Sequence, residues 1–318
     1  MQRLTENKII LVTRPTRVME LKRRFNTRAQ AKFYVSHMGQ DFSDYEREDE
    51  HYVNAVAAAQ QMLAAFGRLQ LIDRSFLPNF VFGPQDVVVV LGQDGLVANT
   101  VKYLNGQPVI GVNPDPARWD GQLLPFRLPD VAKVLPEVLA RKRTIKSVTM
   151  AQATLNTGEK LYAVNDLFIG PRSHSSARYK ITFDSKSENH SSSGVIVSTG
   201  VGSTGWFKSL LAGASGILQS IGTDNAKSPG RTKLVPKSEF AWDSGYLCFT
   251  VREPFPSKTT QAGLVFGRVT AKQSLVIKSQ MPENGVIFSD GIENDFLEFR
   301  SGVRATIAPA DRTGSLVV

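Results

Sequence analysis

The first half of the chain alternates short apolar runs with segments of helical periodicity. The apolar runs 8–13, 87–91 and 108–113 predict strands, and the two later runs lack polar alternation, as parallel strands buried on both faces do. Residues 49–66 repeat apolar side chains at helical spacing and are rich in alanine, and a further helix is expected at 96–104. This alternation of strands and helices predicts an α/β region with a doubly wound parallel sheet.

After about residue 144 the pattern changes to strict alternation of polar and apolar residues. Runs at 145–155, 159–169 and 178–184 predict antiparallel strands, and residues 156–158 predict a hairpin turn between the first two. Further strands are expected at 194–199, 246–252, 274–279, 285–289 and 296–299. One helix, at about 204–221, follows a glycine-rich turn. This half therefore predicts a mainly antiparallel β domain.

The change of pattern divides the chain into two predicted domains, an α/β domain over residues 1–143 and a β-rich domain over 144–299. A length of 318 residues suits two domains of about 150 residues each. Residues 222–240 are polar and contain proline and glycine, so they predict a mobile loop within the second domain.

Composition limits the class of protein. Hydrophobic residues make up 42% of the chain, which excludes disordered, fibrous and coiled-coil proteins. No run of about 18 apolar residues predicts a membrane-spanning helix, and the first residues lack a signal peptide. The single cysteine, Cys248, excludes a disulfide framework, and none of the four histidines stands at metal-ligand spacing from a cysteine or carboxylate. We expect a soluble cytoplasmic protein with no membrane partner and no metal site built by the protein alone.

Positive charge is concentrated at the start of the chain. The net charge is +9, and residues 1–32 hold nine Lys or Arg against two Glu, whereas residues 41–50 hold six Asp or Glu against one Arg. A basic helix is expected at 17–34. An even basic coat would favour nucleic acid as a partner, but this pattern favours a local anion site or, equally, a solvated helix face. We therefore expect no nucleic-acid partner.

A short glycine-containing segment, Gly92-Gln93-Asp94-Gly95, follows the buried strand 87–91 and precedes a helix. In an open α/β sheet, ligands bind at the carboxyl ends of the strands, and a helix start favours an anion. A carboxylate at this place could accept a proton from a hydroxyl group or help to hold Mg²⁺. A turn that only ends the strand is the alternative.

Two polar segments of the second half are further candidates. Residues 198–206 combine three alternating glycines with hydroxyl side chains, which suits a backbone cradle for a polar ligand. They are not a P-loop, because no lysine follows Gly202 at the required place. Asn165 and Asp166 lie inside an apolar run and need partners if buried, either a ligand or the backbone of a turn.

Several segments carry, in order, a resemblance to one known family. They are GQDG at 92–95, PVIGVNPDPARWDGQL at 108–123, AVNDLFIGPRSHSSARY at 163–179, SSGVIVSTGVGSTGW at 192–206, LCFTVREPF at 247–255 and the late Asp290-Gly291. Together they resemble the NAD kinase family, most closely its mitochondrial-type branch, with diacylglycerol and sphingosine kinases more distant. The resemblance covers most of residues 8–306.

The resemblance implies a fold, a reaction and an assembly. The fold is an N-terminal α/β domain, a C-terminal β-sandwich-like domain that binds the dinucleotide, and a C-terminal segment, 300–318, that returns to the first domain. The reaction is phosphorylation by ATP, with Mg²⁺, of the 2′-hydroxyl of the adenosine ribose of NAD, which gives NADP. The assembly is a homodimer.

The resemblance also implies residue roles. Asp94 would be the general base that takes the 2′-hydroxyl proton. The expected contacts to ATP phosphates are Arg14, Arg17, Gly92, Gln93, Gly95 and Asn113. The expected contacts to NAD are Asn165, Asp166, Thr199, Ser203, Thr204 and Trp206.

Some positions depart from the family's pattern. Gln93 replaces the second glycine of GGDG, where its side chain could require a strained φ, and Leu96 replaces the usual Thr or Ser. Ser193 replaces an Asp that the mitochondrial type also lacks. Val201 replaces a residue that usually carries a hydroxyl group. Asp166 replaces Glu and keeps its charge. Two alternatives therefore stay open. One is a kinase of the same superfamily that acts on a nucleoside, sugar or lipid, and the other is a catalytically impaired dinucleotide sensor.

Overall fold

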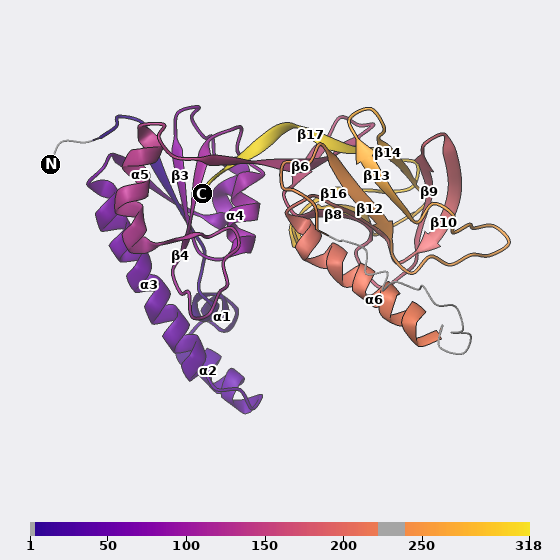
Figure 1. The fold of residues 1–318 in the computed structure, drawn as a ribbon. Coiled ribbons are helices and arrows are strands. Elements are labelled where there is room, and N and C mark those ends of the chain that lie inside the picture. Colours follow the sequence, from indigo (N-terminus) through magenta and orange to yellow (C-terminus); the bar gives the residue numbers. More distant parts are fainter. Residues whose placement is uncertain (1–3, 222–238) are drawn as a thin grey trace. The chain divides into compact units, whose positions relative to one another are not determined.

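The computed structural model describes residues 4–221 and 239–318, which form two compact units (Figure 1). The first unit runs to Lys146 and includes Ser315–Val318, and the second is Ser147–Gly314. The predicted mobile loop at 222–240 lies outside the described residues except for its last two.

The first unit contains a parallel sheet in the order β2-β1-β3-β4. These strands are β1 (Lys8–Thr13), β2 (Arg68–Asp73), β3 (Val87–Leu91) and β4 (Pro108–Asn113), with the short β5 (Phe126–Arg127) beside the end of β4. Ser315 and Leu316, at the end of β17 (Arg304–Val317), also pair with β4. The bounds of β1, β3 and β4 match the predicted runs, so these strand predictions are confirmed.

Both faces of this parallel sheet are covered. The helices are α1 (Arg17–Phe25), α2 (Arg28–His37), α3 (Ser43–Ala64), α4 (Asp94–Val101) and α5 (Val131–Leu139), with short 3₁₀ turns η1 (Arg74–Asn79) and η2 (Leu128–Asp130). Ile9, Val87 and Val89 pack with residues of α3 and α5 in one apolar cluster. Their neighbours Ile10 and Val88 are equally buried. Full burial on both faces explains why these strands lack polar alternation.

Two expectations for this unit are corrected, and one strand was not expected. The helix predicted at 17–34 is two helices, because Asn26 takes a left-handed φ of 64° and Thr27 caps α2. The helix predicted at 49–66 begins earlier, at Ser43, so it includes the acidic segment. Strand β2 was not expected, because it lies at the sheet edge and most of its side chains are at least partly exposed.

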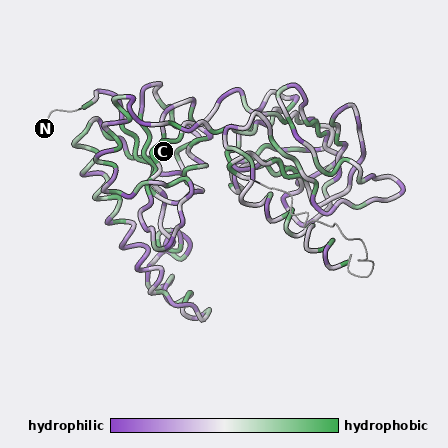
Figure 2. The backbone as a smooth tube through the Cα atoms, viewed as in Figure 1, coloured by the Kyte–Doolittle hydropathy of each residue, from purple (hydrophilic) through white to green (hydrophobic). Residues whose placement is uncertain are grey.

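The second unit packs two antiparallel layers around a common core. One sheet has the order β13-β12-β11-β8-β15-β16, and the other has β10-β9-β14-β17, with β6 pairing with β17 and β7. Their bounds are β6 (Ile145–Leu155), β7 (Lys160–Ala163), β8 (Asp166–Pro171), β9 (Ala177–Phe183), β10 (Lys186–Ser192), β11 (Val195–Ser198), β12 (Tyr246–Val251), β13 (Phe266–Thr270), β14 (Leu275–Ser279), β15 (Gly285–Ser289) and β16 (Ile292–Glu298). The hydrophobic residues gather along these strands (Figure 2). The predicted fold class is confirmed.

A turn and a helix in this unit also match their predictions. Residues 156–158 connect β6 and β7, and the Leu155 amide donates to the Glu159 carbonyl across the turn. The 3₁₀ turn η3 (Gly202–Thr204) leads into α6 (Trp206–Ile221). Within the described ranges, no helix is long and apolar enough to cross a membrane.

Candidate functional site

The loop after β3 places Asp94 at the start of a helix. Gly92 is buried and its amide donates to the Val112 carbonyl of the neighbouring strand. Helix α4 begins at Asp94, two residues earlier than expected, so Asp94 and Gly95 lie in its first turn. The Asp94 carboxyl is half-buried, and its Oδ1 accepts the Leu123 amide at 2.6 Å. The loop therefore combines one oriented carboxylate with the start of a helix, a combination suited to phosphate chemistry.

Gln93 fits this loop without backbone strain. It caps α4 with φ −121° and ψ 165°, which is ordinary extended backbone, so the expected strain is wrong. Its carbonyl accepts the amides of Leu96 and Val97, whereas its half-buried side chain makes no capping hydrogen bond. The departure from GGDG thus changes the side chain beside the helix start but leaves the backbone conformation ordinary.

The two arginines expected to contact phosphate are paired with carboxylates of α3. Arg14 Nη2 lies 2.7 Å from Glu48 Oε1, and both side chains are buried. The guanidinium of Arg14 also lies 4.7 Å from the ring centroid of Tyr52, whose hydroxyl donates to the Leu91 carbonyl at the end of β3. Burial raises the pKa of Tyr52 to about 12. Arg14 is therefore tied to the strand end, and a phosphate there would share it with Glu48.

Asp44 forms ion pairs with Arg17, the second expected arginine, and with Arg118, which the sequence did not single out. It accepts Arg118 Nη2 at 2.6 Å on Oδ1, and Arg118 Nη1 at 3.0 Å and Arg17 Nη2 at 2.7 Å on Oδ2. The hydrogen bonds from Arg118 and then from Arg17 hold the pKa of Asp44 well below its usual range. In the sequence, the signal for this cluster is the acidic segment 41–50 close to the basic residues 1–32.

Asn113 has a structural use that the sequence did not indicate. Its Nδ2 donates to the Trp119 carbonyl at 2.9 Å, and its Oδ1 accepts the Asp115 amide at 3.0 Å. The side chain is buried, so its polar atoms shape the loop that follows β4.

In the second unit, Asp290 organises the residues around Asn165 and Asp166. Its carboxylate accepts the amides of Val164 at 3.0 Å and Asn165 at 2.6 Å, and its own amide donates to the Asp166 carbonyl at 3.0 Å. Asp166 is 8% exposed. Burial, followed by the charge of Asp290, raises the pKa of Asp166 to about 7. Asp166 is therefore a buried carboxyl group that holds its proton more tightly than an exposed aspartate.

The glycine-rich loop packs directly on this site. The Thr199 amide donates to the Asn165 carbonyl at 2.9 Å, and the Thr199 hydroxyl donates to the Val164 carbonyl. Only glycine fits at position 202, because a Cβ there would lie 2.0 Å from the Asn165 carbonyl oxygen. Ser203 is buried and donates to the Gly200 carbonyl at 2.6 Å. The structure therefore brings Asn165, Asp166, Thr199 and Ser203 together, and the two hydroxyl groups hold the loop in shape.

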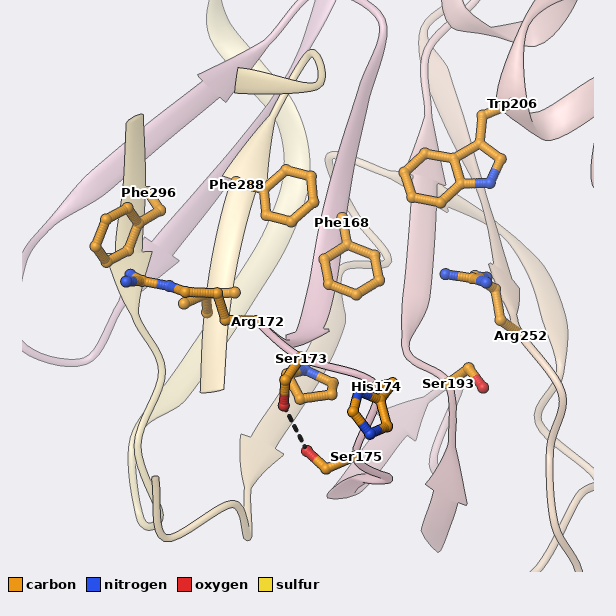
Figure 3. A pocket seen from close by; sticks show the side chains of 12 residues that line it. Phe168, Arg172, Ser173, His174, Ser175, Ser193, Trp206, Arg252, Phe288 and Phe296 are labelled. Carbon is orange, nitrogen blue, oxygen red and sulfur yellow. Dashed lines mark hydrogen bonds between the residues drawn. The ribbon is translucent and has the colours of Figure 1, made fainter. Parts of the chain in front are cut away.

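Trp206 belongs to a cavity of about 340 Å³ beside this loop (Figure 3). The remaining lining residues were not singled out as site residues from the sequence. They are Phe168, Pro171, Arg172, Ser173, His174, Ser175, Ser193, Arg252, Val286, Phe288 and Phe296. Many of them lie in the segments 163–179 and 247–255 that carry the family resemblance.

Comparison with known proteins identifies the fold. No family model and no curated protein matches the sequence. A solved yeast NADH kinase, in complex with NADH, is 14% identical; the match covers 99% of this chain and 84% of that chain, with a TM-score of 0.57. An NAD kinase from Archaeoglobus fulgidus, in complex with ATP, is 16% identical; the match covers 84% of this chain and 89% of that chain, with a TM-score of 0.53. The chain therefore has the fold of NAD and NADH kinases.

Proposed function

We propose that this chain is an NAD kinase of the mitochondrial-type branch, which phosphorylates the 2′-hydroxyl of the adenosine ribose of NAD with ATP. The observation that carries the proposal is Asp94, a half-buried carboxylate in the first turn of a helix that directly follows a buried parallel strand. Two proteins of the same fold, crystallised with NADH and with ATP, support these two classes of substrate.

Asp94 has the chemistry of a general base for this transfer. Since the Leu123 amide occupies Oδ1, the carboxylate is held in one orientation. In the proposed step the 2′-hydroxyl loses its proton to Asp94, its oxygen bonds to the γ-phosphorus, and the bond to the bridging oxygen of ADP breaks. The amides of Asp94 and Gly95, the first two residues of α4, would donate to phosphate oxygens.

The dinucleotide is assigned to the site in the second unit. Asn165 offers an amide side chain and Asp166 a carboxyl group. Asp290 fixes the backbone of both residues through hydrogen bonds to the Asn165 amide and from its own amide to the Asp166 carbonyl. Buried polar groups of this kind discriminate strongly in favour of a ligand that completes their hydrogen bonds. The hydroxyl groups of Thr199, Ser203 and Thr204 donate to backbone carbonyls and would act mainly by fixing the loop, whereas Trp206 would contact the ligand.

Mg²⁺ is proposed as a companion of ATP. Within the described part of the chain, no three His, Cys, Asp or Glu side chains are grouped as metal ligands. Mg²⁺ usually binds with substrate phosphate oxygens and takes only one or two protein carboxylates. Bound Mg²⁺ would neutralise charge that develops on the transferred phosphoryl group. We further infer a homodimer, which light scattering of the purified chain would test.

One observation favours a second candidate. The Gln93 side chain lies beside the helix start where a phosphate would bind, and this favours a dinucleotide sensor that does not use ATP. A superfamily kinase with another acceptor is the third reading. A panel of acceptors incubated with ATP and Mg²⁺, analysed by product mass, separates the three. NADP formation supports the proposal, phosphorylation of another hydroxyl compound supports the third reading, and NAD binding without any product supports the sensor.

A further inference from the structure

The carboxylate of Asp94 is oriented by the loop that joins β4 to β5, residues 114–125. The Leu123 amide of this loop donates to Asp94 Oδ1 at 2.6 Å. Across residues 4–221 and 239–318, no other hydrogen bond to this carboxylate is present. The direction in which Asp94 points therefore depends on where the loop places the Leu123 amide.

The returning end of this loop lies directly against β4. Leu123 is 4% exposed, and a Cβ at position 111 of β4 would lie 2.0 Å from the Leu123 carbonyl oxygen. Glycine at position 111 is therefore required for this close approach of the two backbones. The Leu123 backbone is held between β4 and Asp94, so a shift of the loop would move the amide that orients the carboxylate.

The other end of the loop is shaped by the side chain of Asn113, the last residue of β4. Its Oδ1 accepts the Asp115 amide at 3.0 Å, and its Nδ2 donates to the Trp119 carbonyl at 2.9 Å. Asn113 is 6% exposed, and a Cβ at Gly121, whose φ is +68°, would lie 2.8 Å from Nδ2. One buried side chain therefore fixes the loop at three points, the last of them two residues before Leu123.

We propose that Asn113 is a positioning residue for the base Asp94, and that it acts through this loop and the Leu123 amide without touching a phosphate. The inference rests on the proposed role of Asp94. The donor and the acceptor of the Asn113 side chain each have a partner in the loop, so a phosphate would have to compete with one of these hydrogen bonds. Because a misplacement of about 1 Å at a reacting group can cost roughly 10²-fold in rate, loss of the side chain should lower kcat and leave ATP binding nearly unchanged.

The test compares Asn113→Ala with a matched control, Gln107→Ala, in the full chain. Gln107 directly precedes β4 at its opposite end and is 5% exposed. Its side chain also joins two backbone groups, since it accepts the Asn105 amide and donates to the Gly83 carbonyl. Each variant loses one buried side-chain amide, so denaturant unfolding should show similar losses of stability. Only Asn113→Ala should alter the loop that holds Asp94.

Hydrogen exchange of the Leu123 amide, followed by NMR, is the first measurement. We expect exchange roughly tenfold faster in Asn113→Ala and within about twofold of wild type in Gln107→Ala. This measurement needs no kinase activity. If wild type forms no NADP, the proposed function fails, and the exchange rate still decides whether Asn113 positions the loop. Exchange at the wild-type rate in Asn113→Ala overturns the proposal.

Steady-state kinetics with NAD and varied ATP are the second measurement. In Asn113→Ala we expect kcat roughly 10- to 100-fold lower and a KM for ATP within about twofold of wild type. Both constants should stay near wild type in Gln107→Ala. A raised KM for ATP with kcat retained would mean that Asn113 contacts a phosphate, and this result overturns the proposal. A kcat that falls equally in both variants would indicate a general effect of lost stability and also overturns it.

Discussion

The carboxylate of Asp290 accepts the backbone amide of Asn165 at 2.6 Å, although the two residues are 125 positions apart in the chain. The same carboxylate accepts the Val164 amide and raises the pKa of its buried neighbour Asp166. The turn between β15 and β16 therefore fixes both the backbone and the electrostatics of the proposed dinucleotide site.

Replacing Asp290 by Asn should lower the pKa of Asp166. Burial is the larger cause of the value of about 7, so the pKa should fall while staying above 3.8. Because the folded-state pKa lies above the unfolded value, Asp166 destabilises the native state increasingly as pH rises from about 4 to about 7. In the variant this loss of stability should end at a lower pH. Carboxyl NMR and denaturant unfolding across pH measure both effects, with the exposed Glu283→Gln as control. An unchanged Asp166 titration would contradict the coupling.

Truncating the two polar residues at the start of β8 should weaken NAD binding. Asn165→Ala and Asp166→Ala would each leave ligand groups unpaired, at a cost of roughly 1–3 kcal/mol. Calorimetry with NAD measures the loss, and Asp243→Ala, an exposed carboxylate of the same unit, provides a control. If neither variant changes the affinity, the pair has a structural role only.

The sequence predicted the buried parts of the fold well and the edges poorly. Strands β1, β3 and β4 are short, continuous apolar runs, and such runs indicate buried strands. Strand β10 (KSENHSS) was missed because it is an edge strand without a single apolar residue, so its sequence shows no polar–apolar alternation. The motif around Asp94 was found because its chemistry is local. The contacts of Asp290 with Asn165 and of Asp44 with Arg118 could not be predicted from the sequence, because pairings across 125 and 74 residues depend on the tertiary fold.

The carboxylate of Asp44 should restrain ATP binding. It holds Arg17 and Arg118, and Asp44→Asn would remove the charge that competes with a phosphate for them. We expect a lower KM for ATP, with a loss of stability of about 1 kcal/mol or less because these groups are partly exposed. The matched control is Glu46→Gln on the same helix, which releases Arg28 and Lys32 instead. An unchanged KM would mean that Arg17 does not contact phosphate.

Gln93→Gly tests how the departure from GGDG is used. If the Gln93 side chain turns away from phosphate, the variant should keep or raise activity, since it widens the space beside the helix start. If its amide donates to a phosphate, the KM for ATP should rise by the equivalent of one hydrogen bond, roughly 0.5–1.5 kcal/mol. Steady-state kinetics with varied ATP distinguish these outcomes. Activity that appears only in the variant would instead support the sensor.

The central claim is that Asp94 is the base of an ATP-dependent NAD kinase, and one paired measurement tests it. Wild type and Asp94→Asn are incubated with NAD, ATP and Mg²⁺, and NADP is quantified by mass. Asparagine keeps an oxygen for the Leu123 amide, so the loop and NAD affinity should be nearly unchanged. We predict NADP formation by wild type and a rate about 10²- to 10⁴-fold lower in the variant. No NADP from wild type, or activity within a few-fold of wild type in Asp94→Asn, would contradict the claim.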